Sequence, residues 1–299
     1  MKILLTGATG FLGSHVLPLL LKAGHYVIAP TRRRLAIDHL NLLSIDTGTE
    51  EYLTPGVVPW AEIDAVLHLA ASGVKSSHRQ WPDTLEFNVV GTQRLLESIS
   101  RYAVRRPAFV MTRTFYEHLV DQSPALMENP YIATKYAASE LVKLWSQRYD
   151  GPVSLATVFQ VYGPGDDPAN VLSYAARQIS SGQPATFGSG KGLRDWIYIS
   201  DAASALVAAL AATTSHTPPA ILEQDIGTGE LRSIREMIKQ LSAAAGSASH
   251  TAAAITFDSS EDRPDTNLVL KAINLPHGWK PNTTAEAAIN TLFTATLDN

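Results

Sequence analysis

Cysteine is absent from the 299 residues of this chain, which excludes disulfides, thiolate metal sites and thiol nucleophiles together. None of the nine histidines is paired at the i, i+4 spacing of a helical zinc site, so we expect no metal. No apolar run reaches the roughly 18 residues that a membrane-spanning helix needs. The first predicted strand begins at Lys2, which leaves no room for a signal peptide. We therefore expect a cytoplasmic protein without a membrane partner.

An excess of charge of either sign is also lacking. The chain has 24 Lys and Arg against 28 Asp and Glu, a formal net charge of -4. This balance gives no general attraction to nucleic acid or to anionic lipid. With 45% hydrophobic and 17% charged residues, the chain can bury one large core or one and a half. The composition therefore predicts a soluble globular protein that binds no nucleic acid.

A glycine-rich turn follows the first predicted strand, an apolar run over residues 2–6. Glycine is needed where backbone approaches a pyrophosphate, and the helix behind such a turn offers unpaired N–H groups and a positive dipole end. Because this turn lies between a strand and a helix, we interpret it as a dinucleotide fingerprint rather than an ordinary tight turn. The residues expected to hold the cofactor here are Gly7, Thr9, Gly10, Phe11, Leu12 and Gly13.

An acid is missing directly after the second predicted strand, residues 26–29, where an NAD-specific site usually carries one. Arg32, Arg33 and Arg34 stand there instead, and guanidinium groups are bidentate donors to a 2′-phosphate. The loop therefore predicts NADP(H) in preference to NAD(H), the alternative being a solvated basic loop. A third strand over 41–45 ends at Asp46, a position suited to the adenine edge.

Small residues follow the fourth predicted strand, residues 64–69. Ala70, Ala71, Ser72 and Gly73 are expected to let backbone pass close to a ribose or nicotinamide. Leu69, Ala70 and Ala71 are assigned to the cofactor, and Ser72 to the substrate. His68, inside the strand, is interpreted as a packed core histidine rather than a ligand.

A hydroxyl, a phenol and an ammonium are predicted to meet at one edge of the sheet. Thr112 lies at the end of a fifth strand, and the carboxyl edge of an open α/β sheet is where ligands bind. Tyr131 and Lys135 lie one turn apart on one face of a predicted helix. A free phenol has a pKa of about 10, so it is a poor base until a nearby cation favours the phenolate. The three groups suit hydride transfer at an alcohol or ketone.

Strand and helix alternate less regularly after a sixth strand over 153–159. The sequence predicts an α/β fold, a doubly wound parallel Rossmann sheet with a smaller C-terminal α/β lobe. We assign residues 1–160 to an NADP(H)-binding domain with the Tyr/Lys helix. Residues 161–299 are assigned mainly to a substrate lobe, with some segments returning to the first domain.

Six motifs carry a resemblance to a known family: Thr6-Gly7-Ala8-Thr9-Gly10-Phe11-Leu12-Gly13, His68-Leu69-Ala70-Ala71, Asn88-Val89-Val90-Gly91-Thr92, Tyr131 with Lys135, Val161-Tyr162-Gly163-Pro164-Gly165, and Arg194-Asp195-Trp196-Ile197-Tyr198-Ile199-Ser200-Asp201. With them the chain resembles, over essentially its whole length, the extended short-chain dehydrogenase/reductase superfamily in its NAD-dependent epimerase/dehydratase branch. The resemblance implies a nucleotide-sugar substrate whose pyrophosphate contacts Arg194 and Arg263. We also expect a homodimer.

Three departures from the family pattern refine this expectation. Thr112 replaces the family's catalytic serine and keeps its hydroxyl. Arg113-Thr114 replaces the Asp-Glu with which dehydratases eliminate water, so elimination is not expected, and Arg113 is assigned to the substrate instead. Gln160 stands where the family has an asparagine that contacts the diphosphate. The Tyr-Ile-x-Thr-Lys form and the short loop before it look most like the 4-keto-6-deoxyhexose reductases, including CDP-abequose and CDP-paratose synthases.

Four functions remain open. The main prediction is an NADPH-dependent oxidoreductase that reduces the 4-keto group of a nucleotide-diphosphate 4-keto-6-deoxyhexose. A nucleotide-sugar epimerase would use the same three residues with a retained NAD(P). A reductase of hydrophobic ketones would leave Arg194 and Arg263 without a role, and a non-catalytic NADP(H) sensor would leave Thr112, Tyr131 and Lys135 without one.

Overall fold

Two compact units make up the part of the chain that the computed structural model describes, which is residues 1–32, 35, 37–46, 53, 56–216, 221–247, 254–261 and 267–297. The first unit contains Met1–Val158, Ala203–Ile226 and Asn274–Trp279. The second contains Phe159–Ala202, Gly227–Ile273 and Lys280–Asn299. The chain thus leaves the first unit after Val158, where the sequence-based boundary is 160, and two later segments return to it.

A parallel sheet of seven strands forms the centre of the first unit, in the order β10-β6-β5-β4-β1-β2-β3. Its strands are β1 (Lys2–Thr6), β2 (Tyr26–Thr31), β3 (Leu42–Asp46), β4 (Ala65–His68), β5 (Ala108–Thr114), β6 (Val153–Val158) and β10 (Ile221–Ile226). This sheet confirms the predicted α/β fold with a Rossmann-like parallel sheet. The sequence analysis does not anticipate β10.

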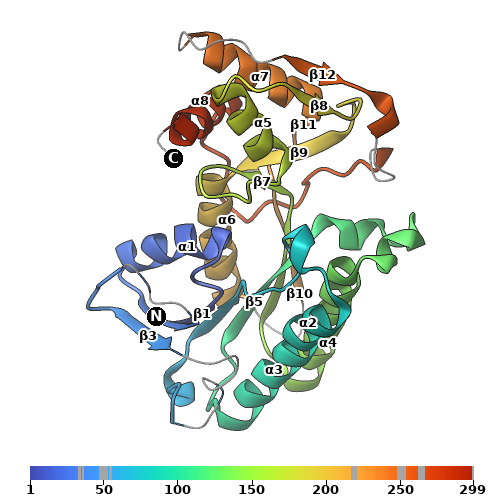
Figure 1. Cartoon of the computed structure of the whole chain (residues 1–299). Coiled ribbons are helices and arrows are strands. Elements are labelled where there is room, and N and C mark those ends of the chain that lie inside the picture. The colour runs from blue at the N-terminus through green and yellow to red at the C-terminus, as the bar shows by residue number, and fades with distance from the viewer. Residues whose placement is uncertain are drawn as a thin grey trace. The chain divides into compact units, whose positions relative to one another are not determined.

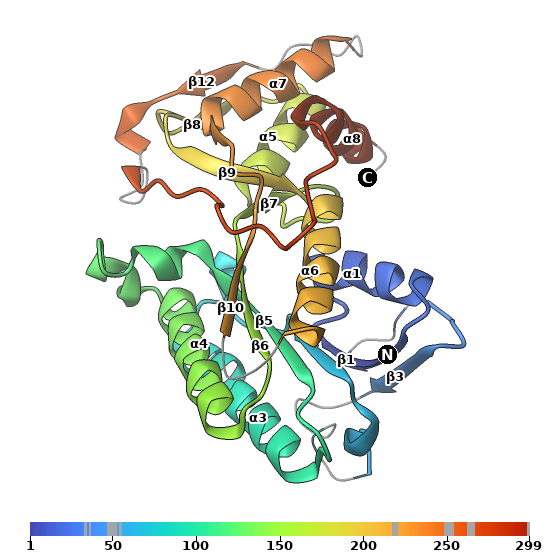
Figure 2. The ribbon, with the colours of Figure 1, turned by 180° about the vertical axis from the view of Figure 1, so that it is seen from behind.

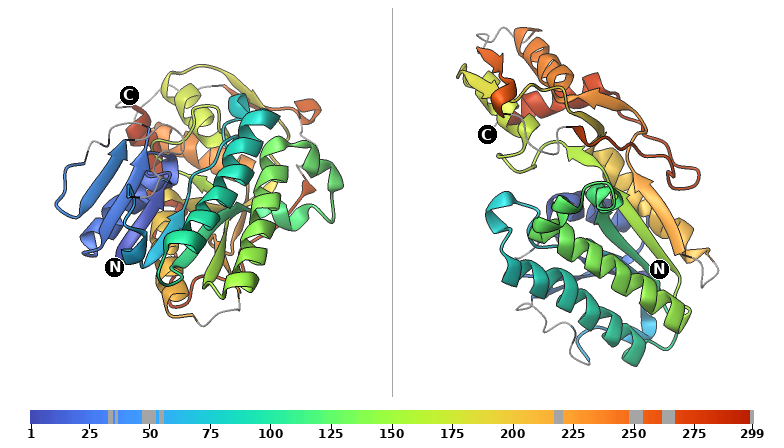
Figure 3. Two further views of the ribbon diagram at one scale, coloured as in Figure 1. Left: turned by 90° about the horizontal axis from the view of Figure 1, so that it is seen from below. Right: turned by 90° about the vertical axis from the view of Figure 1, so that its right-hand side faces the viewer.

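Helices cover both faces of this sheet (Figures 1 and 2). On one face α3 (Gly91–Tyr102) and α4 (Pro130–Tyr149) lie side by side (Figure 3). On the other lie α1 (Phe11–Lys22) and the first-unit part of α6 (Ile199–Thr214). The strand order reverses between β1 and β4, and in open α/β sheets ligands bind beyond the carboxyl ends of the strands at such a switch point.

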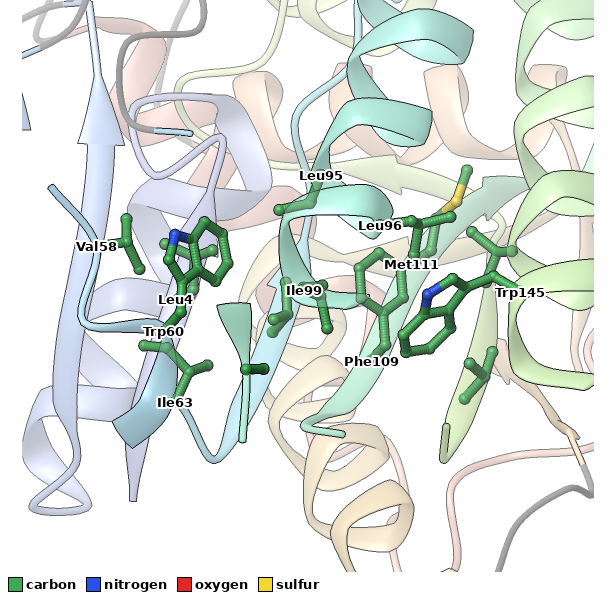
Figure 4. Packing of buried hydrophobic residues seen from close by; sticks show 14 of the residues in the cluster. Leu4, Val58, Trp60, Ile63, Leu95, Leu96, Ile99, Phe109, Met111 and Trp145 are labelled. Atoms are coloured by element: carbon green, nitrogen blue, oxygen red, sulfur yellow. The ribbon is translucent and has the colours of Figure 1, made fainter. Parts of the chain in front are cut away.

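An apolar core fills the space between the sheet and α3 and α4. Alternate residues of a strand point to the same face, so Phe109 and Met111 of β5 both enter this core. Figure 4 shows the Phe109 ring beside the Trp145 indole of α4, with ring centroids 6.0 Å apart. Full burial of a Phe or Met side chain stabilises a fold by about 1.5–3 kcal/mol. The core therefore fixes the sheet edge and the helix that carry the predicted catalytic residues.

The helical run after β4 is interrupted by a change of helix type. It consists of α2 (Trp81–Thr84), a π-helical segment (Leu85–Val90) and then α3. π-helical turns inside α-helices often mark functional sites. The π-helical segment contains Asn88, whose contacts are described below.

The second unit has its own core. Its helices α5 (Val171–Ser180), α7 (Ile234–Ser247) and α8 (Ala285–Leu297) pack against one another around Leu172, Ile179, Met237, Leu241, Leu292 and Phe293. Its strands are β7 (Gln160–Tyr162), β9 (Leu193–Tyr198) and β11 (Leu231–Ser233) in one sheet, and β8 (Ala185–Phe187) and β12 (Ile255–Phe257) in another. In neither unit is any described helix both long and apolar enough to cross a membrane.

Candidate active site

The turn between β1 and α1 is built on glycines that accept no side chain. Gly7 has a φ of +75°, and a Cβ added there would lie 2.7 Å from the backbone nitrogen of Ala70. A Cβ at Gly13 would lie 2.0 Å from the Gly7 carbonyl oxygen. No side chain caps the start of α1 at Gly10, so the N–H groups of its first turn are available to an anion. The turn forms a cradle that suits a pyrophosphate.

The segment 68–73, after β4, links this cradle to the predicted catalytic residues. Its Ala70 packs against Gly7, as just described. The Thr112 hydroxyl donates a hydrogen bond to the carbonyl oxygen of His68, at 3.5 Å. At its far end, a Cβ on Gly73 would lie 3.3 Å from Cβ of Tyr131. The glycine turn, β5 and the start of α4 therefore meet around one segment at the carboxyl edge of the sheet.

His68 ties two neighbouring elements together inside the core. Its Nδ1 lies 2.7 Å from the Thr6 hydroxyl of β1, and its Nε2 lies 3.0 Å from the Thr92 hydroxyl of α3. Burial, with a smaller contribution from the Lys135 charge, lowers the pKa of His68 to about 3, so the ring is neutral. This is the packed core histidine that the sequence predicts.

Asn88, in the π-helical segment, fixes both the segment 68–73 and α4. Its side-chain oxygen accepts the Ser72 N–H at 2.7 Å, and its amide donates to the Ser72 carbonyl at 3.0 Å. The same amide donates to the Thr134 hydroxyl at 2.9 Å. Because Thr134 lies between Tyr131 and Lys135, Asn88 holds this turn of α4 against the segment 68–73.

Tyr131 and Lys135 occupy the first turns of α4. The helix begins with Pro130, where a missing N–H costs nothing, and the Asn129 side chain accepts the Tyr131 N–H at 3.0 Å. Lys135 follows one turn later and is only 3% exposed. Within the described part of the chain, neither the Tyr131 hydroxyl nor the Lys135 ammonium has a hydrogen-bond partner. The Tyr131 hydroxyl and the Lys135 ammonium are therefore available to bind a ligand.

The pKa values of Tyr131 and Lys135 are shifted in opposite directions. Burial lowers the pKa of Lys135 to about 8, and the Glu117 carboxylate opposes this shift. Burial, followed by the charge of Glu117, raises the pKa of Tyr131 above its ordinary value, while Arg79 lowers it. Lys135 is not among the causes of the Tyr131 shift, and the phenol carries its proton at neutral pH.

Glu117 is a site residue that the sequence analysis does not identify. It lies in the 3-10 helix η5 (Phe115–Leu119) and is 6% exposed. One oxygen accepts the Thr114 N–H at 2.8 Å and the other accepts the Ser139 hydroxyl at 2.6 Å. The Thr114-x-x-Glu117 spacing is that of a capping box, which is the signal that could have revealed it.

The edge formed by β2 and β3 carries the residues expected at the adenosine end of the cofactor. β2 ends at Thr31, which pairs with Asp46 at the end of β3. Arg32 follows directly, and its guanidinium lies 5.4 Å from the ring centroid of Phe87. Arg33 lies outside the described residues. Among the described residues, no contact tests the expected cofactor binding. The cofactor roles of Arg32, Arg33 and Asp46 therefore stay predictions.

Residues 3–223 match the model of the NAD dependent epimerase/dehydratase family. The chain belongs to this family. It is 34% identical over 229 residues to an uncharacterised UDP-glucose epimerase, YtcB, of Bacillus subtilis, covering 70% of this chain and 72% of that protein. It is 30% identical to the UDP-glucose 4-epimerase of Neisseria meningitidis serogroup B, covering 82% and 83%. Among solved structures, MoeE5 in complex with UDP-glucose and NAD has a TM-score of 0.73 at 27% identity, covering 99% of this chain and 98% of that one.

Two observations show that the described residues can hold a nicotinamide dinucleotide. The glycine cradle at Gly7 and Gly13 leaves room only for backbone, with the free N–H groups of α1 beside it. Lys135 presents a buried ammonium without a hydrogen-bond partner among the described residues. A cofactor supplies an acceptor for each: phosphate oxygens for the cradle and ribose hydroxyls for the ammonium.

Arg113, predicted to contact the substrate, is held by side chains of the first unit. Neighbouring residues of a strand point to opposite faces, so Arg113 and Thr112 diverge. The Arg113 guanidinium, 5% exposed, donates to the Thr157 hydroxyl at 2.8 Å and forms an ion pair with Glu223 of β10 at 2.7 Å. It also lies 2.9 Å from the His118 ring. These contacts hold Arg113 inside the first unit, and its substrate role stays a prediction.

The remaining predicted substrate residues are distributed between the two units. Ser72 lies in the first unit, held by Asn88. Gln160 and Arg194 lie in the second, on β7 and β9. Arg194 is buried and donates to the carbonyl oxygens of Leu193 and Leu268. Arg263 lies outside the described residues, and the substrate roles of all four stay predictions.

Proposed function

We propose that this protein transfers hydride between a nicotinamide dinucleotide and C4 of a nucleotide-activated sugar, with 4-epimerisation as the first candidate reaction. The observation that carries the proposal is the meeting of the glycine cradle, the Thr112 hydroxyl and the start of α4 around the segment 68–73. The names of the relatives support the substrate class and the epimerase reaction, since two are named as UDP-glucose epimerases.

Each catalytic side chain has one task in this proposal. Tyr131 exchanges a proton with the sugar oxygen: it takes the proton when the alcohol is oxidised and returns it when the ketone is reduced. Thr112 redirects its hydroxyl proton from the His68 carbonyl to that oxygen. Lys135 holds the nicotinamide ribose and stabilises the phenolate while Tyr131 is deprotonated. A bound nicotinamide supplies the hydride acceptor or donor.

A 4-ketoreductase is the second candidate, and the end of β2 favours it. Arg32 follows Thr31 at the strand end, where an NAD-binding relative would carry an acid for the ribose 2′-hydroxyl. A guanidinium there suits the 2′-phosphate of NADPH, a cofactor that a reductase consumes at every turnover. Under this candidate the substrate is a nucleotide-diphosphate 4-keto-6-deoxyhexose. Elimination of water has no support, because Arg113 and Thr114 replace the two acids that it needs.

Absorbance at 340 nm separates the candidates. With UDP-glucose and catalytic amounts of NAD(P), an epimerase forms the C4 epimer without net change in absorbance. With a 4-keto-6-deoxyhexose nucleotide, a reductase oxidises one NADPH for each sugar reduced. Tyr131→Phe is the control in both assays and should abolish either signal. Binding of NADPH with no conversion of either sugar nucleotide would reject the proposal in favour of a sensor, and conversion of hydrophobic ketones alone would reject the sugar substrate.

A further inference from the structure

Arg32 and Phe87 make a contact that joins two segments far apart in the sequence. The Arg32 guanidinium lies over the Phe87 ring, with its central carbon 5.4 Å from the ring centroid. Attraction between a cation and the face of an aromatic ring holds such a pair together. Both residues belong to the first unit, Arg32 directly after β2 and Phe87 in the π-helical segment Leu85–Val90.

The strand order places this contact beside the glycine turn. β1 pairs with β2 on one side and with β4 on the other, so the carboxyl ends of β2 and β4 lie about 10 Å apart with the end of β1 between them. The glycine turn leaves β1 at that point. Arg32 extends β2, and Phe87 is fixed near the end of β4, because its neighbour Asn88 binds both backbone groups of Ser72. The contact therefore joins the two strand ends on either side of the turn.

The π-helical segment directs two neighbouring side chains to different surroundings. Asn88 is 2% exposed and binds the Thr134 hydroxyl of α4, whereas Phe87 is 36% exposed and lies under Arg32. Phe87 is not one of the described residues that form the apolar core between the sheet and α3 and α4. Its ring can therefore be removed without opening a cavity in that core.

The contact restrains Arg32 without using its hydrogen-bond donors. Among the described residues, no hydrogen bond or ion pair involves the Arg32 guanidinium. Glu86, the acid next to Phe87, forms an ion pair with Arg94 at 3.2 Å instead. An aromatic ring attracts a cation but does not take up its N–H groups in conventional hydrogen bonds. The N–H donors of Arg32 therefore stay available to an anion.

We propose that Phe87 is a positioning residue for cofactor preference, whose ring holds the Arg32 guanidinium ready to bind the ribose 2′-phosphate of NADP(H). This inference rests on the proposed function, which brings a nicotinamide dinucleotide to the glycine turn. With the pyrophosphate at that turn, the adenosine ribose lies toward the end of β2, where Arg32 begins. A dianionic phosphate offers acceptors to the guanidinium, and a restrained arginine loses less conformational freedom when it binds them.

A ring that positions Arg32 differs in its effect from a ring that contacts the cofactor itself. The first strengthens binding of the 2′-phosphate alone, so its removal should weaken binding of NADPH and leave that of NADH almost unchanged. The second would pack against the adenosine, which both cofactors contain, and its removal would weaken both. The ratio of the two dissociation constants therefore separates the two roles, and a general loss of structure would not move this ratio.

Isothermal titration calorimetry with NADPH and with NADH tests the inference. Phe87→Ala should raise the Kd for NADPH about threefold to fivefold, the size of an exposed cation–π contact, and that for NADH by less than about twofold. Phe87→Leu should behave in the same way, because it keeps apolar bulk without an aromatic face, and Phe87→Trp should retain the wild-type ratio. Leu85→Ala removes an exposed apolar side chain from the same segment and is the matched control, with no expected change in the ratio.

A double-mutant cycle shows whether Phe87 acts through Arg32. In an Arg32→Ala background, Phe87→Ala should cause no further loss of NADPH affinity, because the guanidinium that the ring positions is gone. An equal loss in both backgrounds, or equal losses for NADPH and NADH, would overturn the inference. An unchanged ratio in Phe87→Ala and Phe87→Leu would overturn it as well, and so would a wild-type protein that binds NADH at least as tightly as NADPH.

The titrations need no sugar nucleotide, so they separate this inference from the proposed function. A protein that shows the expected dependence on Phe87 but converts no sugar nucleotide would support the inference and reject the proposed function. Conversion of a sugar nucleotide by a protein whose cofactor preference does not depend on Phe87 would have the opposite meaning. A wild-type protein that binds neither cofactor would reject both.

Discussion

The Asn88 amide donates a hydrogen bond to the Thr134 hydroxyl at 2.9 Å, which joins a π-helical segment before α3 to the turn of α4 between Tyr131 and Lys135. Asn88 also binds both backbone groups of Ser72. One buried amide therefore sets the position of this turn of α4 relative to the segment 68–73.

Asn88→Ala should destabilise the first unit. The change removes three hydrogen bonds and leaves part-buried backbone groups of Ser72 without their partner, a loss of about 2–3 kcal/mol in the free energy of unfolding. Urea denaturation measures it, with Asn290→Ala at an exposed position of α8 as the control. A loss no larger than that of the control would show that Asn88 does not hold this junction.

Tyr131→Phe should lower turnover by about 10²–10⁴-fold, the effect of losing a general acid–base group. Cofactor affinity should change little, because the ring stays and its hydroxyl has no hydrogen-bond partner among the described residues. Steady-state kinetics together with quenching of protein fluorescence by cofactor measure the two effects. Near-normal turnover in a chemistry-limited step would remove Tyr131 from the mechanism, and a large loss of cofactor affinity would assign it a binding role instead.

Lys135→Met should change how stability depends on pH. The Lys135 pKa is lowered from 10.5 to about 8 in the folded protein, so between these values the unfolded chain binds more protons than the folded one. The wild-type protein should therefore gain stability relative to K135M as pH rises from about 8 to 10.5, by about 3 kcal/mol, and below pH 8 it should carry the full penalty of the buried ammonium.

Denaturant unfolding of wild-type and K135M proteins at pH 7, 9 and 10.5 measures this difference. Lys22→Met, at an exposed position of α1, is the control and should show no such pH dependence. A constant difference between wild type and K135M across the series would mean that the ammonium carries no burial penalty.

Arg32→Ala should raise the Michaelis constant for NADPH far more than that for NADH, because a guanidinium beside a dianionic phosphate makes charge-assisted hydrogen bonds. The double change with Arg33→Ala should enlarge the effect. Arg101→Ala, on α3, is the control for loss of a surface cation. Equal effects of Arg32→Ala on both cofactors would show that this loop does not distinguish them, and would remove the support for the reductase candidate.

The first half of the fold was predictable because buried parallel strands are apolar runs, and the strands before Thr112 all have this form. β10 was missed because Glu223, Gln224 and Asp225 occupy its centre. As the last strand of the sheet it has a neighbour on one side only, and its polar residues bind other side chains: Glu223 binds Arg113, and Gln224 binds Ser154.

The candidate site was predictable where short motifs define it and not where distant segments meet. Tyr131 and Lys135 share one helical turn, so their pairing can be read from spacing. Glu117 reaches Ser139 across 22 positions of sequence, and no local pattern reports that contact. The contacts of Arg113 were not anticipated because the sequence analysis ended the strand at Thr112. β5 continues to Thr114, and strand alternation then directs Arg113 to the opposite face.

Transfer of deuterium from cofactor to sugar tests the central claim most directly. The protein is incubated with NADPH or NADH deuterated at C4 of the nicotinamide and with a nucleotide-activated 4-ketohexose, and the product is read by NMR. Both candidate reactions predict deuterium at C4 of the sugar, formed by wild-type protein and lost in Tyr131→Phe. A protein that binds the cofactor but leaves no deuterium at C4 would contradict the account.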